Sequence, residues 1–344
     1  MRVGVHLGAW SRGYEQLTLA RAAEDRGYDS VWVSENYGSD GASVLGWLAA
    51  QTDRVRIGSA VLQLAGRTPA LTAMTAATVD GLSGGRFVLG LGVSGSQVVE
   101  GWHGQEFDRP VRRLREHVEI VRLALAREPL DYDGELYRVS RAGSAGTPLK
   151  LVIEPVQERI PIYLGTFAPQ ATALAAEIAD GWIPFLYSPE RADMFRPSLR
   201  QGAARAGRSL SELAVAPLVE AAVGADLEQR RARLRPVVAL YVGGAGCREQ
   251  NLCEPCPPLR LRQRRRPATG AVPLGPPRRG GGGGAGRDAR RADALRAVRT
   301  RRERLGAFAG AGVDTVVVSP AAATLQERLE TVNALAPLAE RFRG

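Results

Sequence analysis

Short apolar runs and longer amphipathic stretches alternate along this chain. A run of about four to eight apolar residues is typical of a buried strand, whereas apolar residues that recur once per helical turn are typical of a helix. Eight runs fit the strand pattern: residues 3–7, 30–33, 55–62, 87–91, 162–164, 182–185, 213–223 and 315–319. Helical patterns follow most of them, at residues 14–26, 45–53, 69–82, 111–127, 170–179 and 226–242, and from Thr324 onward.

This alternation predicts parallel strands joined by right-handed crossover helices. Eight units favour the α/β class and a closed (β/α)8 TIM barrel over an open doubly wound sheet. An open sheet would carry a glycine fingerprint after its first strand, but residues 7–10 read Leu-Gly-Ala-Trp. We expect one domain over residues 1–344. Function in a barrel lies on the loops after the strands, which selects residues 34–40, 63–68, 92–95, 165–168 and 186–188.

Residues 83–95 are the most informative stretch of the sequence. They read as a tight turn, a buried strand and a glycine-rich loop at the end of that strand. Glycine has no Cβ, so a ligand can approach the backbone closely there. The pattern predicts a site for a large planar or phosphorylated molecule at the end of a parallel sheet.

Short motifs lie in these loops and strands in a consistent order, across residues 1–246 and 303–344. They are Trp32-Val-Ser-Glu-Asn-Tyr-Gly-Ser-Asp40, Arg67-Thr-Pro-Ala70, Leu82-Ser-Gly-Gly-Arg-Phe87, Gly90-Leu-Gly-Val-Ser-Gly95, Gly101-Trp-His-Gly104, Ile162-Tyr-Leu-Gly165, Glu177-Ile-Ala-Asp-Gly-Trp182 and Thr315-Val-Val-Val-Ser-Pro320. In order and spacing the set resembles the luciferase-like monooxygenase superfamily. It most resembles the branch of oxidoreductases (LLM class) that uses the deazaflavin coenzyme F-420.

The resemblance implies hydride transfer between coenzyme F-420 and a small organic substrate, with the tricyclic ring at the barrel mouth. The protein would supply binding, orientation and exclusion of water. Glu35 and Asn36 are the implied catalytic residues, because the family often has an acidic residue and a histidine after the second strand. Asn36 stands at the histidine position, so a histidine-based acid step is in doubt.

The resemblance also implies binding residues. The helix after residue 168 could hold the coenzyme's phosphate with its N-terminal amides, although Ala168-Pro169-Gln170 lacks the lysine that the family often carries there. Trp102 and His103 are the implied substrate or lid contacts. The implied cofactor-binding residues are Gln63, Arg67, Thr68, Gly92, Val93, Ser94, Gly95, Gly165, Thr166, Phe167, Ala168 and Trp182.

Several of these residues have a structural interpretation as well. Glycines after strands can serve turns alone, and Glu35 can stabilise the first turn of a helix through its dipole. Trp182 fits a core position and His103 a solvated loop. His6, on an apolar strand, fits a hydrogen-bonded place in the core.

Charge and cysteines are concentrated in one segment. Residues 247–302 hold fifteen arginines and four acidic residues, a net charge of +11, so the rest of the chain carries −1 of the total +10. Basic character therefore belongs to this segment rather than to a binding face. Cys247, Cys253 and Cys256 supply one CxxC pair without a second pair or a nearby histidine, so no metal site is expected.

The segment 247–302 also lacks a hydrophobic period and is rich in Arg, Gly and Pro, so we expect it to be disordered or irregular. One possible coding of residues 259–275, read one nucleotide later, gives YGFDSAADRQQELYLSG, a capped amphipathic helix. We therefore favour a frame-shifted stretch, natural or from sequencing, over a genuine Arg/Gly insert. It would replace the region after the seventh strand.

Four functions remain open from the sequence. The first is a coenzyme F-420 oxidoreductase; the second is an FMN-dependent monooxygenase that uses O2 and a flavin or deazaflavin reductase as partner. The third is an inactive frameshifted product, and the fourth is a nucleic-acid binder acting through the Arg/Gly tract, which has no aromatic residues for stacking. We see no secretion signal or apolar span and expect a cytoplasmic protein, with a homodimer as a possible assembly.

Overall fold

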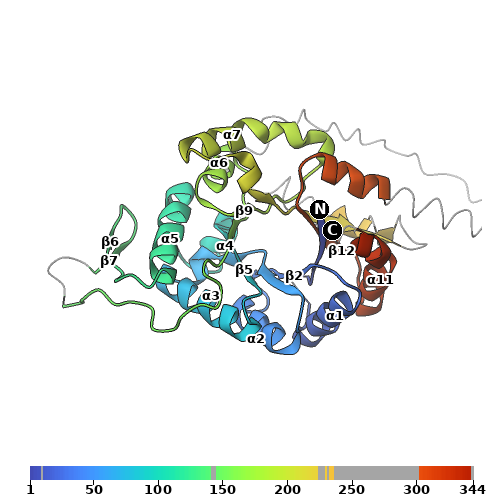
Figure 1. The fold of residues 1–344 in the computed structure, drawn as a ribbon, viewed down its shortest axis with the longest axis horizontal. Helices are drawn as coiled ribbons and strands as arrows, with labels where there is room; N and C mark the ends of the chain where they lie inside the picture. Colours follow the sequence, from blue (N-terminus) through green and yellow to red (C-terminus); the bar gives the residue numbers. More distant parts are fainter. Residues whose placement is uncertain (9–10, 141–144, 224–228, 231, 236–301, 342–344) are drawn as a thin grey trace, which may run out of the picture.

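Parallel strands form a barrel in the computed structural model (Figure 1), which describes residues 1–8, 11–140, 145–223, 229–230, 232–235 and 302–341. In the order in which they pair, the barrel strands are β1 (Arg2–His6), β2 (Ser30–Val33), β3 (Arg56–Ser59), β5 (Phe87–Gly92), β8 (Ile162–Leu164), β9 (Gly181–Trp182), β10 (Ala214–Val215) with β11 (Leu218–Ala221), and β12 (Thr315–Pro320).

The barrel closes through the run of residues that contains β10 and β11. Ala214 of β10 pairs with Gly181 of β9, and Leu218 of β11 pairs with Val317 of β12. β12 in turn pairs with β1, so the sheet returns to its first strand. The predicted eight-stranded parallel barrel is confirmed, with β10 and β11 as the two halves of one barrel strand.

An outer ring of helices surrounds this sheet (Figure 1). The strands alternate their side chains between two apolar layers, as a period of two requires. In β12, Val316 and Val318 pack outward in the large core cluster, whereas Val317 packs inside the barrel with Trp32 and Val88. The helices are α1 (Gly13–Asp25), α2 (Gly41–Gln51), α3 (Pro69–Ser83), α5 (Pro110–Leu125), α6 (Pro169–Ile178), α7 (Arg196–Arg205), residues 302–310 and α11 (Leu325–Arg341).

Helix α3 shows how local sequence sets an element. The Thr68 side chain accepts a hydrogen bond from the Leu71 amide as an N-cap, and Pro69 occupies the first turn. The helix ends at Gly84, whose φ of 64° is left-handed. Both ends can be predicted from the sequence, and the predicted helix at 69–82 agrees closely with the observed α3.

Other strand predictions were too simple. The run 55–62 is divided into β3 and β4 (Leu62–Gln63), with a cis peptide bond between Ala60 and Val61. The run 213–223 is interrupted at Pro217, because proline has no amide hydrogen for the ladder. The run 182–185 keeps regular pairing only at its start, with an isolated bridge from Phe185 to Leu218.

Several elements were not predicted. An antiparallel hairpin of β6 (Tyr132–Asp133) and β7 (Arg138–Val139) projects from the barrel beside α5 (Figure 1). Two-residue strands are too short to give a periodic signal. The remaining unpredicted elements are α4 (Ser96–Val99), α7, the helix at residues 302–310 and the 3-10 turns Leu64–Gly66, Pro189–Met194 and Leu210–Glu212.

The segment 247–302, with its three cysteines, lies outside the described residues except for Arg302, so its expected disorder and frame shift stay predictions. The helix predicted over 226–242 lies largely outside them as well, although residues 229–230 and 232–235 are helical. Among the described helices, none is both long and apolar enough to cross a membrane. The described part of the chain also holds no cluster of three or more His, Cys, Asp or Glu side chains arranged for a metal ion.

Candidate functional site

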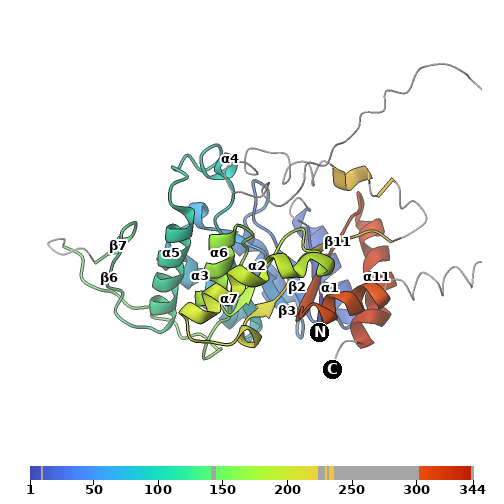
Figure 2. The ribbon, with the colours of Figure 1, turned by 90° about the horizontal axis from the view of Figure 1, so that it is seen from above.

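A cavity of about 1120 Å³ opens at the carboxyl ends of the barrel strands. Figure 2 shows this end of the barrel beside α4, with the N-terminus at the opposite end. Its walls come from the loops after β1, β2, β5 and β8, from β11 and β12, and from the start of α5. The size suits a large cofactor together with a substrate.

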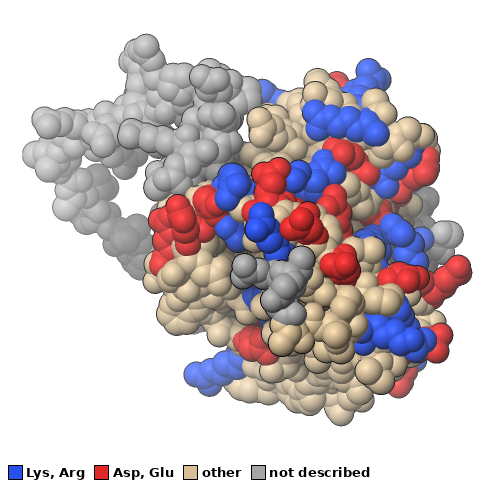
Figure 3. Space-filling model, turned by 90° about the vertical axis from the view of Figure 1, so that its left-hand side faces the viewer, with Lys and Arg blue, Asp and Glu red and all other residues tan. Residues whose placement is uncertain are grey.

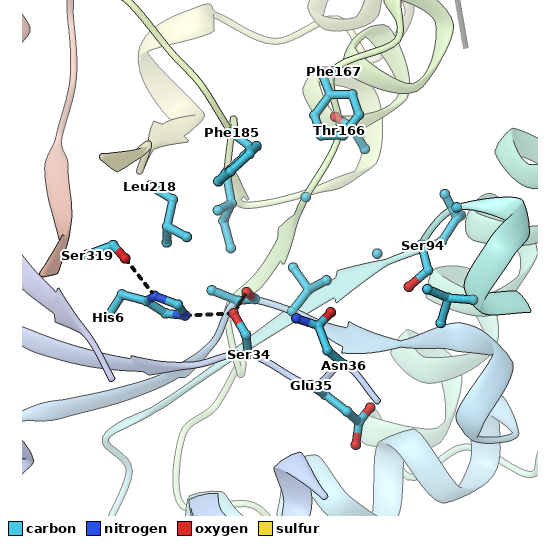
Figure 4. A pocket seen from close by; sticks show the side chains of 18 of the residues that line it. His6, Ser34, Glu35, Asn36, Ser94, Thr166, Phe167, Phe185, Leu218 and Ser319 are labelled. Carbon is cyan, nitrogen blue, oxygen red and sulfur yellow. Dashed lines mark hydrogen bonds between the residues drawn. The ribbon is translucent and has the colours of Figure 1, made fainter. Parts of the chain in front are cut away.

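Ten of the predicted site residues line this cavity. They come from three loops that the barrel rule selected, which lie far apart in the sequence. Asn36 points into the cavity and Ser94 lines its far side (Figure 4). The ten are Glu35, Asn36, Gly92, Val93, Ser94, Gly95, Gly165, Thr166, Phe167 and Ala168.

Glu35 lines the wall, but its carboxylate is held by protein groups. Oε1 accepts hydrogen bonds from the Gly41 amide at 3.1 Å and from Arg67 at 2.5 Å, and Oε2 accepts one from the Gln63 amide at 3.0 Å. The Arg67 and Glu35 side chains are only 6% and 10% exposed. In Figure 4 the carboxylate points away from the cavity centre. Glu35 therefore ties β2 to β4 and to the start of α2.

Gln63, Arg67 and Thr68 lie behind Glu35 rather than on the cavity surface. The Gln63 side chain donates to the Glu35 carbonyl at 2.7 Å, and Thr68 caps α3. Direct contact with a cofactor, as predicted for these three, would require them to line the cavity. They support its wall, because Gln63 and Arg67 bond Glu35 and Thr68 caps α3.

Trp182, Trp102 and His103 also lie off the cavity wall. Trp182 is 1% exposed and donates from Nε1 to the Thr166 carbonyl at 2.9 Å, so the core interpretation fits it. His103 Nε2 lies 2.9 Å from Gln63 Oε1, while Trp102 is 64% exposed near Tyr37.

The glycines of the wall are required by close packing around Val61. A Cβ added to Gly92 would approach Val61 Cγ2 to 2.6 Å, and one added to Gly165 would approach Val61 Cγ1 to 2.8 Å. Val61 itself lines the cavity. These two glycines therefore admit a protein side chain at the cavity surface.

A neighbouring part of the wall holds a chain of polar side chains, none of which was among the predicted site residues. His6 Nδ1 lies 3.3 Å from Ser319 Oγ, and His6 Nε2 lies 2.7 Å from Ser34 Oγ (Figure 4). Ser34 Oγ donates to the Ala60 carbonyl at 2.5 Å. Burial and the nearby Arg328 lower the pKa of His6 to about 4, so the imidazole is neutral at pH 7. The expected hydrogen bonding of His6 is present, and the ring also lines the cavity.

Glu220 on β11 lies next to this chain and was missed. It is the cross-strand partner of Ser319 and lines the cavity. Burial raises the pKa of its carboxyl group, and a hydrogen bond with Ser319 partly offsets that rise. The signal was available, because Leu218 and Glu220 are two residues apart on one strand and must face the same side.

The end of the cavity near α6 suits an anion. Residues 165–171 line it, and α6 begins without a side-chain cap on its amides. Arg109, Arg112 and Arg115 of the α5 region line the cavity too. Arg112 and Arg115 are paired with Glu116 and Glu177 respectively, and Arg109, which is 56% exposed, is paired with Asp108.

On the flank of the barrel seen in Figure 3, basic and acidic side chains are interspersed. Arg138 pairs with Asp133, and Arg112 pairs with Glu135. Mixed signs of this kind do not form the positive stripe that a nucleic-acid backbone requires.

Comparison with known proteins identifies the relatives of this barrel. A family model described as luciferase-like monooxygenase matches residues 1–335. The chain belongs to this family.

Two sequence relatives of this luciferase-like chain are named as an oxidoreductase and a reductase. A Mycobacterium tuberculosis protein named as a coenzyme F-420-dependent oxidoreductase is 44% identical over 260 residues, covering 73% of this chain and 75% of that protein. The 5,10-methylenetetrahydromethanopterin reductase of Archaeoglobus fulgidus is 32% identical and covers 71% of each.

Solved structures agree on the luciferase-like fold. A coenzyme F-420-dependent secondary alcohol dehydrogenase in complex with a coenzyme–acetone adduct superposes with a TM-score of 0.74 at 16% identity, covering 100% of this chain and 99% of that one. The coenzyme F-420-dependent tetrahydromethanopterin reductase of Methanopyrus kandleri gives a TM-score of 0.67 at 20% identity. At such identities the likeness concerns the fold alone.

Proposed function

We propose that this luciferase-like protein is an oxidoreductase that transfers hydride between coenzyme F-420 and a small organic substrate. The observation that carries the proposal is the asymmetry of the cavity. One end has an uncapped helix N-terminus and arginines, while the other has apolar groups and a neutral His6, with its cations Arg328 and Arg233 paired with Glu15 and Glu327. A cofactor with an uncharged ring and an anionic tail matches both ends. Relatives named for coenzyme F-420 support the same choice.

The residues of the cavity divide the work of binding. Asn36, Val93 and Ser94 would contact the ring, and residues 165–168 with the start of α6 would hold the phosphate of the tail. Glu35 keeps the wall rigid through Arg67, Gln63 and Gly41. The apolar side chains of Phe185 and Leu218 exclude water from the substrate end. When bound, coenzyme F-420 supplies hydride chemistry at the reactive carbon of its ring.

An FMN-dependent monooxygenase is the second candidate, favoured by the family's own description. It would need reduced FMN from a reductase partner and O2 as cosubstrate. FMN also carries an aromatic ring and a phosphate, so the same cavity would serve it, and only a direct comparison of the two cofactors separates the candidates.

Fluorescence titration of the full chain with coenzyme F-420 and with FMN tests the proposal. We expect the deazaflavin to bind with the lower Kd. Ala168→Asp should weaken its binding about tenfold or more, because an acid at the N-cap occupies the α6 amides and repels the tail. Ala168→Asn caps the same amides without charge and is the matched control.

The Ala168 variants also separate lost binding from lost folding. Either cap should keep or raise the free energy of unfolding by about 0.5–1 kcal/mol, as urea denaturation would measure. Tighter binding of FMN than of coenzyme F-420 would favour the second candidate. Equal coenzyme affinity of the wild type and Ala168→Asp would mean that α6 does not bind the coenzyme.

We further propose that the protein forms a homodimer through α2 and α3. These helices contain no Lys or Arg, and their one acid, Asp80, is buried. Their exposed apolar side chains continue into one surface, since Gly13 lies beside Trp47 and Gly46 beside Leu82. Met74→Glu should lower the mass measured by light scattering to that of a monomer. Leu149→Glu, which changes an exposed apolar residue outside these helices, is the control.

A further inference from the structure

The wall formed by β11, β12, β1 and β2 carries polar side chains in a continuous order. Glu220 of β11 is the cross-strand partner of Ser319 of β12. Ser319 lies 3.3 Å from one nitrogen of His6, whose other nitrogen lies 2.7 Å from Ser34. Three of these residues, His6, Ser34 and Ser319, are less than 10% exposed. Polar groups that are buried in this way need hydrogen-bond partners, and here they supply them to one another.

We call the series Glu220, Ser319, His6, Ser34 and the Ala60 carbonyl the polar row. The Ala60 carbonyl, at its end, fixes the donor and the acceptor of each hydrogen bond in the row. The Ala60 carbonyl can only accept, so the single Ser34 hydroxyl hydrogen is donated to it at 2.5 Å. Ser34 Oγ must then accept from His6, which places the hydrogen of the neutral ring on Nε2. His6 Nδ1 is left as an acceptor and takes the hydroxyl hydrogen of Ser319.

Ser319 Oγ can therefore offer only lone pairs to Glu220 in this arrangement. Ser319 has a single hydroxyl hydrogen, so donating it to an ionised Glu220, which lowers the pKa of that carboxyl group, would leave His6 Nδ1 without a donor. A protonated carboxyl group donates to Ser319 and completes the row. The geometry thus favours a neutral Glu220 at the cavity surface.

From this arrangement we propose that Glu220 is the residue that exchanges a proton with the substrate, as a carboxylic acid held at the head of an oriented hydrogen-bond row. The proposal rests on the proposed hydride transfer. Glu220 would supply the general acid. Asn36 cannot do so, because an amide side chain does not release a proton at neutral pH.

The electrostatic surroundings of Glu220 agree. Burial raises the pKa of its carboxyl group, and within the described residues no basic side chain contributes to that pKa. The other charged side chains that line the same cavity are paired with other groups: Arg328 with Ser11 and Glu15, Arg233 with Glu327, Glu35 with Arg67, Arg109 with Asp108, Arg112 with Glu116 and Arg115 with Glu177. His6 is the titratable group in the row itself, and its lowered pKa keeps it neutral.

The chemical step balances as follows for a carbonyl substrate. Hydride, with both electrons, would be supplied to the carbonyl carbon by bound reduced coenzyme F-420 as the carbon–oxygen π bond breaks. The oxygen takes the proton of Glu220, which leaves an alcohol, oxidised coenzyme and a carboxylate. Ser319 can turn its hydroxyl toward that carboxylate, and solvent returns the proton. Oxidation of an alcohol is the reverse sequence.

Spectroscopy tests the row without any coenzyme. In infrared difference spectra at pH 7, the wild type should show a protonated carboxyl band that Glu220→Gln lacks and that Glu158→Gln, an exposed control, retains. Nitrogen-15 NMR should find the hydrogen of His6 on Nε2. A carboxylate band for Glu220, or an Nδ1-protonated His6, overturns the proposal.

Turnover tests the role of Glu220. With reduced coenzyme F-420 and a panel of ketones and aldehydes, Glu220→Gln should lower kcat about 10²- to 10⁴-fold, while its coenzyme Kd by fluorescence stays that of the wild type. Equal kcat in the variant and the wild type overturns the proposal. Absence of coenzyme F-420 binding in the wild type refutes the proposed function instead, and the spectroscopic result on the row is unaffected by it.

Discussion

Two acidic residues line the same cavity from opposite walls, and their surroundings give them different chemistry. Glu35 accepts hydrogen bonds from two backbone amides and from Arg67, all within 3.1 Å. Glu220 has a buried serine for its neighbour and a pKa raised by burial. Residue type alone does not separate them, since environment decides which carboxyl group stays charged and which exchanges protons. The predictions below contrast the two walls, from the largest expected effect to the smallest.

The Glu35 wall should be the more sensitive to loss of its cation. Arg67→Met leaves a buried carboxylate without its partner and should lower the free energy of unfolding by about 3–5 kcal/mol, measured by urea denaturation. The double variant Arg67→Met/Glu35→Gln should recover part of the loss. Arg138→Met, from a pair with side chains 62% and 89% exposed, should cost under about 1 kcal/mol. Similar losses in both single variants would contradict this contrast.

The His6 wall should weaken in acid. The unfolded chain protonates His6 near pH 6.5, while the folded pKa is about 4. Stability is therefore complete above pH 6.5 and falls as the pH drops toward 4, by about 3 kcal/mol for this group. His117, with its pKa lowered to about 3 by burial, adds to the same trend. Urea denaturation across this window should show a smaller acid loss in His6→Gln than in the wild type; identical losses would exclude the burial effect.

Ser34 connects the two walls, because it bonds both His6 and the Ala60 carbonyl. Ser34→Ala should cost about 1–3 kcal/mol, since it leaves a buried N–H and a carbonyl oxygen without partners. Ser188→Ala removes an exposed hydroxyl that bonds Glu190 and serves as the control in the same unfolding measurement. A loss no larger than that of the control would mean that water replaces Ser34.

The smallest expected effect concerns Glu220 and depends on pH. Below the ordinary pKa of glutamate, folded and unfolded chains are both protonated, and Glu220→Gln should leave stability unchanged. As the pH rises toward the raised folded pKa, only the unfolded wild type ionises, so the wild type loses stability and the variant does not. The variant should become the more stable of the two near neutral pH. A variant that is less stable there would mean that Glu220 is ionised in the fold.

The barrel, and most of the cavity wall that contains Asn36, Ser94 and Thr166, could be predicted from local sequence. Alternating strand and helix patterns fix the order of elements, and the Thr68 cap and Gly84 fix the ends of α3. The rule that loops follow strands then selected Asn36, Ser94 and the residues around Thr166, because each follows its strand directly in the chain. The β6–β7 hairpin was not predicted, because two strands of two residues each are too short to show a hydrophobic period.

The second wall was decided by tertiary structure. His6, Glu220 and Ser319 belong to three strands and Ser34 directly follows a fourth, and only the register of β11, β12, β1 and β2 brings them into one row. Likewise, only the approach of β4 to β2 gives Glu35 its arginine and amides. Sequence determined which residues follow each strand, because that depends on neighbours along the chain. Which charges are paired, and which carboxyl group stays neutral, depends on burial and on partners distant in sequence, and closure of the barrel sets both.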